Sequence, residues 1–221
     1  MNKEKIAVIF DMDGVLIDST KYIWESFNVL VEPMGMHFDE TAIKKYLGNS
    51  LRDQIIMWKE DYGIDVGDVN EFSTKAHKIA TKLANDNPNH NEDLLALLEE
   101  LKRKNIPMGV GTSSTRERAH SMLLSVNINQ YFTSIVTSED VIEHKPNPHI
   151  FLEVANQLEI SPENCVVIED SATGILAAKN GNMKAIGFLT EWNSKEELEK
   201  ADKIIDSFNV LSYEELEKMF V

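Results

Sequence analysis

Apolar and polar positions follow two kinds of pattern along this chain. Residues 6–10 form an unbroken apolar run that ends at two carboxylates and a glycine, which is typical of a strand buried on both faces of a parallel sheet. Residues 17–88 instead place apolar side chains three to four positions apart, which predicts helices. Beyond residue 88, short apolar runs alternate with helical periodicity. That alternation predicts a parallel α/β sheet with right-handed crossovers.

The helical stretch is predicted to contain four helices. The first ends at Pro33-Met34-Gly35 and the second near Gly48, while the third follows a cap at Ser50. The fourth runs from about Asp68 to Leu83, and the polar residues 85–89 after it have the composition of a linker. We therefore expect one α/β core, residues 1–16 plus 89–221, interrupted by a helical insert at 17–88.

Strands and helices alternate in the second part of the chain. Strands are predicted over 107–111, 134–137, 165–168, 183–187 and 203–205, the last at a sheet edge. Helices are predicted over 92–104 and 173–180, and a third runs to Leu158 with Asn147 as cap and Pro148 in its first turn. Ser114 and Glu117 have the spacing of a capping box and predict the start of another helix.

Candidate chemistry begins where the first strand ends, at Asp11 and Asp13. Two carboxylates two residues apart in extended chain point to the same face, so a cation or a shared proton is expected between them. One could act as nucleophile and the other as acid and base. A solvated turn and a receiver-type phosphoacceptor are alternatives. An EF-hand is excluded, because its sixth and twelfth positions hold Leu16 and Tyr22 instead of glycine and glutamate.

Three other predicted strands also lead into polar residues. Thr112 and Ser113 stand at a helix start, where hydroxyls and free amides can bind anionic oxygens, although a plain helix cap explains them equally simply. Lys145 lies between prolines that restrict its backbone, and Glu169 with Asp170 repeats the apolar-run-then-acid pattern. Because the carboxyl ends of parallel strands share one edge, these residues are expected to converge on one crevice.

Composition narrows the classes of partner. The chain has 221 residues, is 43% hydrophobic and carries a formal net charge of −15, which disfavours nucleic acid and anionic membranes as main partners. Cys165 is the single cysteine and predicts a buried structural thiol in a reducing compartment. With no secretory signal and no apolar stretch of transmembrane length, we expect a cytoplasmic protein, a monomer or weak dimer.

Taken in order, these motifs resemble those of the haloacid dehalogenase superfamily of phosphohydrolases. Asp11-Met12-Asp13-Gly14, Thr112, Lys145 and Glu169-Asp170 occur in the family's sequence order, over essentially the whole chain. A receiver-type phosphoacceptor requires a different order of the acidic motifs, so this alternative is excluded. The insert resembles the α-helical C1-type cap of the β-phosphoglucomutase-like subfamily. The resemblance implies a Rossmann-like parallel sheet core with an inserted helical cap domain.

The resemblance also implies a mechanism and a cofactor. Asp11 would attack phosphorus and become an aspartyl phosphate, and Asp13 would protonate the leaving group and then activate water. Mg²⁺ would be bound by Asp11, the Asp13 backbone carbonyl and Asp170, with Glu169 either a further ligand or a residue that orients the others. Thr112, Ser113 and Lys145 would hold phosphoryl oxygens. The substrate would be a small phosphomonoester, such as a sugar phosphate or related metabolite.

Some positions depart from the family pattern and keep alternatives open. Val15 stands where many phosphatases have threonine, which favours a sugar phosphomutase, whereas Ile23 stands near a histidine of the mutase-like members and argues against one. Arg52 lies one residue beyond the mutase arginine, so it is either a second phosphate clamp or a solvated charge. His144 and His149 are expected to face solvent. A binding protein without catalysis is the remaining alternative.

Overall fold

The computed structural model describes residues 5–46, 51–87 and 92–220. The chain divides into two compact units, residues 1–18 with 89–221 and residues 19–88. The first boundary lies two residues beyond the predicted one, at 18 in place of 16. The roles of catalytic core and cap for these two parts stay a prediction.

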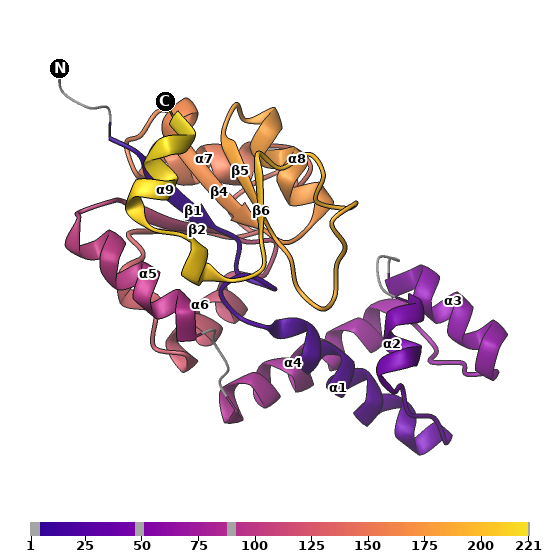
Figure 1. The fold of residues 1–221 in the computed structure, drawn as a ribbon. Coiled ribbons are helices and arrows are strands. Elements are labelled where there is room, and N and C mark those ends of the chain that lie inside the picture. The colour runs from indigo at the N-terminus through magenta and orange to yellow at the C-terminus, as the bar shows by residue number, and fades with distance from the viewer. Residues whose placement is uncertain (1–4, 47–50, 88–91, 221) are drawn as a thin grey trace. The chain divides into compact units, whose positions relative to one another are not determined.

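A single parallel sheet forms the centre of the larger unit (Figure 1). Its strands lie in the order β3-β2-β1-β4-β5-β6, and every neighbouring pair is parallel. The strands are β1 Ala7–Phe10, β2 Met108–Gly111, β3 Ser134–Val136, β4 Cys165–Glu169, β5 Lys184–Phe188 and β6 Lys203–Ile205. The predicted α/β class is confirmed, and β6 lies at the edge as expected.

Helices cover both faces of the sheet, which explains the unbroken apolar runs in its central strands. Helices α7 (His149–Gln157) and α8 (Ala172–Asn180) pack on one face, while α5 (Glu92–Arg103) and α9 (Tyr213–Glu217) lie on the other (Figure 1). Alternate strand residues turn to the α7 and α8 side, including Ile9 of β1 and Val167 of β4. Cys165 is buried in the same layer, so it is a structural thiol as predicted.

Two predicted helix starts differ from the structure by one residue. Helix α6 (Arg116–Ser125) begins after Thr115, whose hydroxyl accepts a hydrogen bond from the Arg118 amide. The predicted capping box at Ser114 is therefore wrong, because the Ser114 hydroxyl donates to a carboxylate instead. Helix α7 has Pro148 at its N-cap position in place of Asn147, although the Asn147 side chain still accepts from the His149 amide.

The smaller unit is helical and is held together by aromatic side chains. Its helices are α1 Ser19–Val31, α2 Glu40–Tyr46, α3 Leu51–Tyr62 and α4 Val69–Asp86. The rings contact one another mainly edge to face, and they come from Trp24, Phe27, Phe38, Tyr46, Trp58 and Phe72. Asp68 caps α4, which begins close to the predicted start and ends three residues beyond the predicted end at Leu83. Gly35 has φ +81° after a short 3₁₀ turn, and this left-handed conformation explains why the first helix ends there. Ser50 and Gly48 lie outside the described residues.

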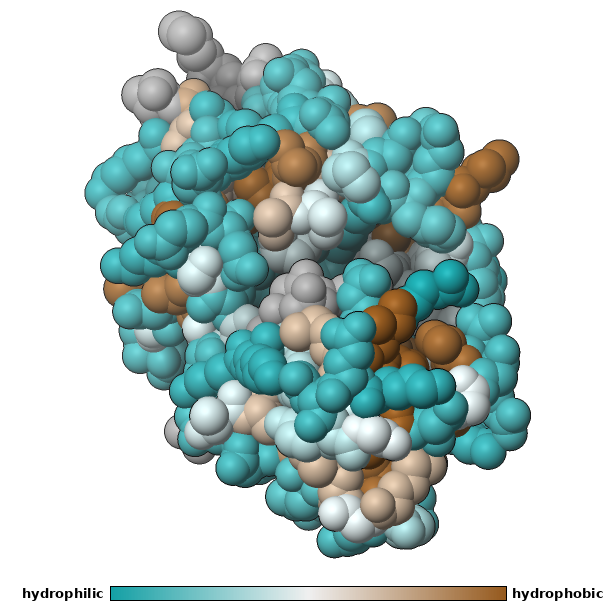
Figure 2. Space-filling view, turned by 90° about the vertical axis from the view of Figure 1, so that its right-hand side faces the viewer, coloured by the Kyte–Doolittle hydropathy of each residue, from teal (hydrophilic) through white to brown (hydrophobic). Residues whose placement is uncertain are grey.

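Short 3₁₀ helices join several of these elements, at Glu32–Met34, Asn129–Tyr131, Pro162–Asn164, Phe208–Val210 and Lys218–Phe220. Among the described residues, no helix combines the length and the apolar character that crossing a bilayer requires. The face drawn in Figure 2 is mostly hydrophilic, with hydrophobic residues gathered in small patches.

Candidate active site

Asp11 stands at the first position after β1 and is 6% exposed. Its amide donates to the Ile168 carbonyl of β4 at 2.9 Å, which continues the strand pairing and fixes its backbone. The chain then turns through Gly14, which has φ +81°. A Cβ at Gly14 would overlap the carboxylate of Asp170, so glycine allows the first and fourth strands to place their acids side by side.

Lys145 makes the contacts that decide its role. It comes from the loop between β3 and α7, and its side chain is 7% exposed. Its Nζ donates to Asp11 Oδ1 at 2.5 Å and to Glu169 Oε1 at 2.9 Å, and it lies 4.6 Å from the centre of the Phe151 ring. Burial alone lowers the pKa of Lys145, but the two carboxylates outweigh it and raise the pKa above its usual range. Lys145 is therefore a buried member of this cluster and not a solvated surface charge.

Three carboxylates gather around the lysine. Oxygens of Asp11, Glu169 and Asp170 all lie within 4.8 Å of one another. Burial raises the pKa of Asp11 to about 7, and burial together with the Glu169 and Asp11 charges raises the pKa of Asp170 well above its usual value. One lysine charge cannot balance three carboxylates. A hard divalent cation fits this oxygen-rich set and would remove the repulsion.

Local hydrogen bonds hold the acidic residues in place. Glu169 is 1% exposed, and its Oε2 accepts from the Ser171 amide at 2.6 Å. The Asn193 side chain donates to the backbone carbonyl of Asp170 at 2.7 Å, which ties the segment after β5 to the end of β4. A Cβ at Gly174 in α8 would overlap the Glu169 carboxylate, so this helix also depends on a glycine to admit the acid.

Thr112 and Ser113 follow β2, which is the neighbour of β1 in the sheet. Thr112 is 1% exposed, its amide donates to the Val136 carbonyl, and its hydroxyl accepts from the Ser114 amide at 3.1 Å. Ser113 is exposed. Both residues lie at the carboxyl end of the parallel strands, as predicted. Their role in binding phosphate stays a prediction.

Asp13 has partners that the sequence did not reveal. Arg118 donates to both of its carboxylate oxygens, each at 2.7 Å, and the Ser114 hydroxyl donates to Oδ2 at 2.8 Å. In the sequence, Arg118 is one charged residue in a helix rich in charge, and nothing marks it. Ser114 lies before the helix and its cap, so helical spacing does not pair it with Arg118, and their shared contact with Asp13 depends on the folded arrangement.

The remaining predicted site residues that the structure describes are exposed. Arg52 is exposed in the first turn of α3 and belongs to the helical unit, so its role as a phosphate clamp stays a prediction. The turn Gly48-Asn49-Ser50 lies outside the described residues. His144 and His149 are exposed, as predicted, and His149 Nδ1 lies 3.5 Å from a Glu143 oxygen.

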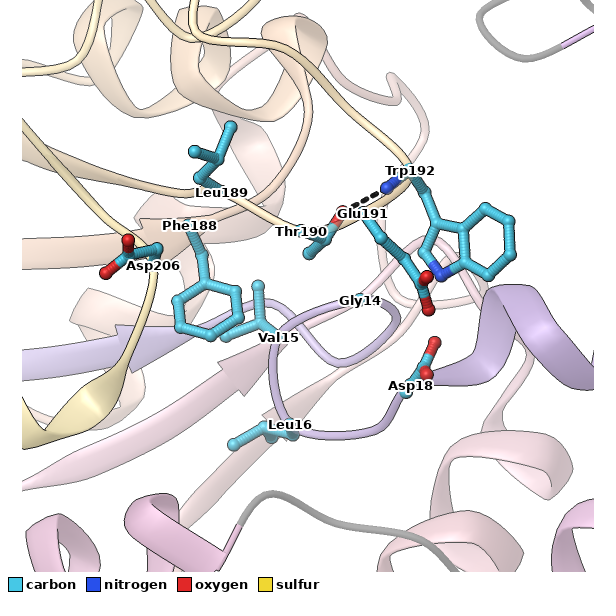
Figure 3. Close-up of a pocket in the computed structure, with 10 residues that line it drawn as sticks. All are labelled: Gly14, Val15, Leu16, Asp18, Phe188, Leu189, Thr190, Glu191, Trp192 and Asp206. Atoms are coloured by element: carbon cyan, nitrogen blue, oxygen red, sulfur yellow. Dashed lines mark hydrogen bonds between the residues drawn. The ribbon is translucent and has the colours of Figure 1, made fainter. Parts of the chain in front are cut away.

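A hollow of about 390 Å³ opens beside Gly14. It is formed by the turn after β1, the segment after β5 and Asp206 after β6. Figure 3 shows the carboxylates of Asp18 and Glu191 pointing toward one another beside the indole of Trp192. The acidic lining disfavours an anionic phosphoryl group there.

Comparison with known proteins agrees with this geometry. The model of the family described as haloacid dehalogenase-like hydrolase matches residues 8–188. A phosphorylated carbohydrates phosphatase of Thermotoga maritima is 30% identical over 81% of this chain and 83% of its own length. A beta-phosphoglucomutase of Bacillus subtilis is 31% identical over 82% of each chain. The crystal structure of beta-phosphoglucomutase from Clostridium difficile has a TM-score of 0.76 at 27% identity, covering 98% of this chain and 97% of its own.

The order of the strands, the cluster of acids around Lys145 and the match over residues 8–188 lead to the same assignment: this chain belongs to the haloacid dehalogenase-like hydrolase family.

Proposed function

We propose that this chain is a phosphatase that hydrolyses a small phosphomonoester, a phosphorylated carbohydrate or related metabolite, through an aspartyl phosphate. The observation that carries the proposal is the buried Asp11 carboxylate, held by Lys145 and surrounded by Glu169 and Asp170. The Thermotoga maritima relative, named as a phosphatase of phosphorylated carbohydrates, supports the substrate class.

The reaction proceeds in two displacements at phosphorus. In the first, an Asp11 oxygen bonds to phosphorus while the bond from phosphorus to the leaving oxygen breaks, and Asp13 gives its proton to that oxygen to release an alcohol. In the second, a water oxygen attacks the aspartyl phosphate, Asp13 takes the water proton, and the bond between phosphorus and Asp11 breaks. Inorganic phosphate leaves, and both carboxyl groups return to their starting states.

The other residues of the site bind and orient the phosphoryl group. Lys145, Thr112 and Ser113 supply donors to its oxygens, where charge accumulates in the transition state. Mg²⁺ is the cation we propose, held by Asp11, the Asp13 backbone carbonyl and Asp170, with Glu169 beside them. When bound, it offsets the repulsion between the Asp11 carboxylate and the phosphate dianion. We propose the helical unit as a cap whose residues, including Arg52, contact the leaving group.

The test uses the full chain with p-nitrophenyl phosphate. We expect turnover that requires Mg²⁺ and stops in excess EDTA, and an Asp170→Ala variant that needs much more metal than wild type. Asp11→Asn should keep the fold, because the side chains have nearly the same shape, yet lose turnover by many orders of magnitude, since uncatalysed phosphomonoester hydrolysis is extremely slow. Full activity in EDTA, or more than a few per cent in Asp11→Asn, contradicts the proposal.

A phosphomutase is the second candidate, favoured by the Bacillus subtilis and Clostridium difficile relatives named beta-phosphoglucomutase. Incubation with a hexose 1-phosphate separates the two. Formation of the 6-phosphate isomer identifies a mutase, whereas free hexose and inorganic phosphate identify a phosphatase. Ile23, which cannot donate a hydrogen bond to a sugar hydroxyl, favours the second outcome.

A further inference from the structure

Arg118 reaches Asp13 from the first turn of α6, more than one hundred residues later in the sequence. Its two terminal nitrogens each lie 2.7 Å from a different oxygen of the Asp13 carboxylate. This two-pronged contact fixes the carboxylate plane as well as its position, which a single ammonium group cannot do. The Arg118 side chain is 11% exposed and that of Asp13 is 33% exposed. The pair therefore lies mostly within the protein.

Ser114 supplies the second restraint on Asp13. Its hydroxyl donates to Asp13 Oδ2 at 2.8 Å, and Arg118 also contacts the same hydroxyl. The Ser114 backbone carbonyl accepts from the amide and the hydroxyl of Ser138, each at 3.1 Å, so the serine is itself held by the segment after β3. Because Thr115 caps α6, the Ser114 side chain is free to serve Asp13.

The burial of Arg118 argues against a purely stabilising ion pair. Its Nε is buried without a hydrogen-bond partner among the described residues. A buried guanidinium costs desolvation free energy, and an unsatisfied donor adds to that cost. The presence of such a pair is therefore weak evidence that it stabilises the fold. Its geometry, in contrast, defines the orientation of the Asp13 carboxylate.

We propose that Arg118, with Ser114 as the second contact, is a positioning residue for the acid–base carboxylate of Asp13. This inference rests on the proposed function, because it takes the role of Asp13 from there. Arg118 touches neither the phosphoryl group nor the leaving group in this assignment. It fixes the plane of the Asp13 carboxylate. When Asp13 carries the proton that it gives to the leaving oxygen, the oxygen bearing that proton gives up its contact with Arg118, and the contact at the other oxygen keeps the orientation.

The choice of leaving group distinguishes a positioning role from a structural one, because a structural defect should lower kcat/KM by the same factor for every substrate. A sugar alkoxide is a strong base and needs the Asp13 proton as its bond to phosphorus breaks, whereas p-nitrophenolate is a weak base and leaves without it. The ratio kcat/KM covers the steps up to departure of the first product. Loss of Asp13 orientation should therefore lower kcat/KM for a hexose phosphate much more than for p-nitrophenyl phosphate.

The experiment compares two glutamine variants of the same helical turn. Arg118→Gln removes the contact, while Arg116→Gln removes an exposed guanidinium that pairs with Asp140 at the surface. The substrates are p-nitrophenyl phosphate and whichever hexose phosphate the wild-type chain hydrolyses best. General acid catalysis contributes about 10²–10⁴-fold, so we expect Arg118→Gln to lower kcat/KM for the hexose phosphate by about 10²-fold and for p-nitrophenyl phosphate by less than about fivefold.

Arg116→Gln should leave both values near wild type. Arg118→Lys, which keeps the charge but loses the fork, should fall between wild type and Arg118→Gln on the hexose phosphate alone. If Arg118→Gln does not fold, Ser114→Ala and Arg118→Lys are judged by the same substrate ratio. An equal loss on both substrates, or no loss on either, overturns the proposal. Failure of the proposed function is seen separately, as wild-type protein that hydrolyses neither substrate.

Discussion

At the scale of single residues, the buried Lys145 is the side chain on which most of the site depends. It neutralises part of the charge on Asp11 and Glu169, and its ammonium is kept away from water by the Phe151 ring. Removing it takes the balancing charge and one hydrogen bond from each of the two buried carboxylates, which costs more than the loss of an exposed ion pair. The same change removes a donor that we propose for the phosphoryl oxygens.

Lys145→Ala should lower kcat/KM by about 10²–10³-fold, the scale of one lost transition-state donor. Lys179→Ala is the matched control, because Lys179 pairs with Asp202 at a side-chain exposure of 35% and lies outside the candidate site. We expect this control to keep wild-type kcat/KM with p-nitrophenyl phosphate. A wild-type rate for Lys145→Ala would contradict the role given to this lysine.

Asp11, Glu169 and Asp170 could be predicted from the sequence because they end apolar runs that form strands, and Lys145 because it stands beside prolines in a recognisable motif. It did not identify Arg118, and the reason is physical. The contact between Arg118 and Asp13 depends on β1 and β2 being neighbours and on α6 beginning one residue later than the capping pattern suggests. Neither the pairing of strands nor a shift of one residue can be read from local periodicity.

At the scale of elements, the strands and helices follow the sequence closely, and the differences lie at their ends. The hydroxyl of Ser114 had two possible partners, a helix amide or a carboxylate from a distant strand. In the structure it bonds the carboxylate, while the adjacent Thr115 caps the helix. Long-range contacts thus decide which of two neighbouring hydroxyl groups becomes the cap.

Helix α8 leads to a prediction about the space that a helix must leave for the side chain of Glu169. Gly174 lies in its first turn, and a Cβ there would overlap the carboxylate of Glu169, which is 1% exposed and has little room to move. Gly174→Ala should therefore lower the free energy of unfolding by about 1–3 kcal/mol, although alanine is the better helix former. Denaturation by urea measures the change.

Thr173→Ala is the control for this prediction, since Thr173 is exposed in the same turn. It should change the free energy of unfolding by less than about 0.5 kcal/mol, as is usual for surface substitutions. Activity gives a second measurement: displacement of Glu169 disturbs the cluster with Asp11 and Asp170, so kcat/KM should fall in Gly174→Ala alone. A Gly174→Ala variant as stable and active as wild type would show that the acid has more freedom than its burial indicates.

At the scale of the whole molecule, the chain enters and leaves its helical unit at two crossings, near residues 18 and 88. In the sequence, the insertion directly follows the turn that carries Asp11 and Asp13. The sequence indicated this division through the change from strand to helical periodicity and the polar stretch at 85–89. It could not indicate which helical residues would contact a substrate in the proposed cap role, because local periodicity does not report contacts between distant parts of the chain.

The proposed cap role predicts that the helical unit closes when the site is filled. The proposed closure is a rotation of the helical unit about the two chain crossings, near residues 18 and 88, which would exclude water before Asp11 attacks. Small-angle scattering of the full chain should show a smaller radius of gyration with Mg²⁺ and beryllium fluoride, a phosphoryl analogue, than with Mg²⁺ alone. Asp11→Asn serves as control, because it removes the carboxylate that the analogue binds and should not contract.

The proposed closure would also place substrate choice in the helical unit. If Arg52 contacts the leaving group, Arg52→Ala should reorder the preferred substrates in a panel of phosphorylated metabolites while changing kcat/KM for p-nitrophenyl phosphate by less than about threefold, since the chemical groups remain in the α/β unit. Arg103→Ala, a substitution on α5 of the larger unit, should leave the order unchanged. Identical scattering with and without the analogue, together with an unchanged substrate order in Arg52→Ala, would remove the cap role and leave the α/β unit to act alone.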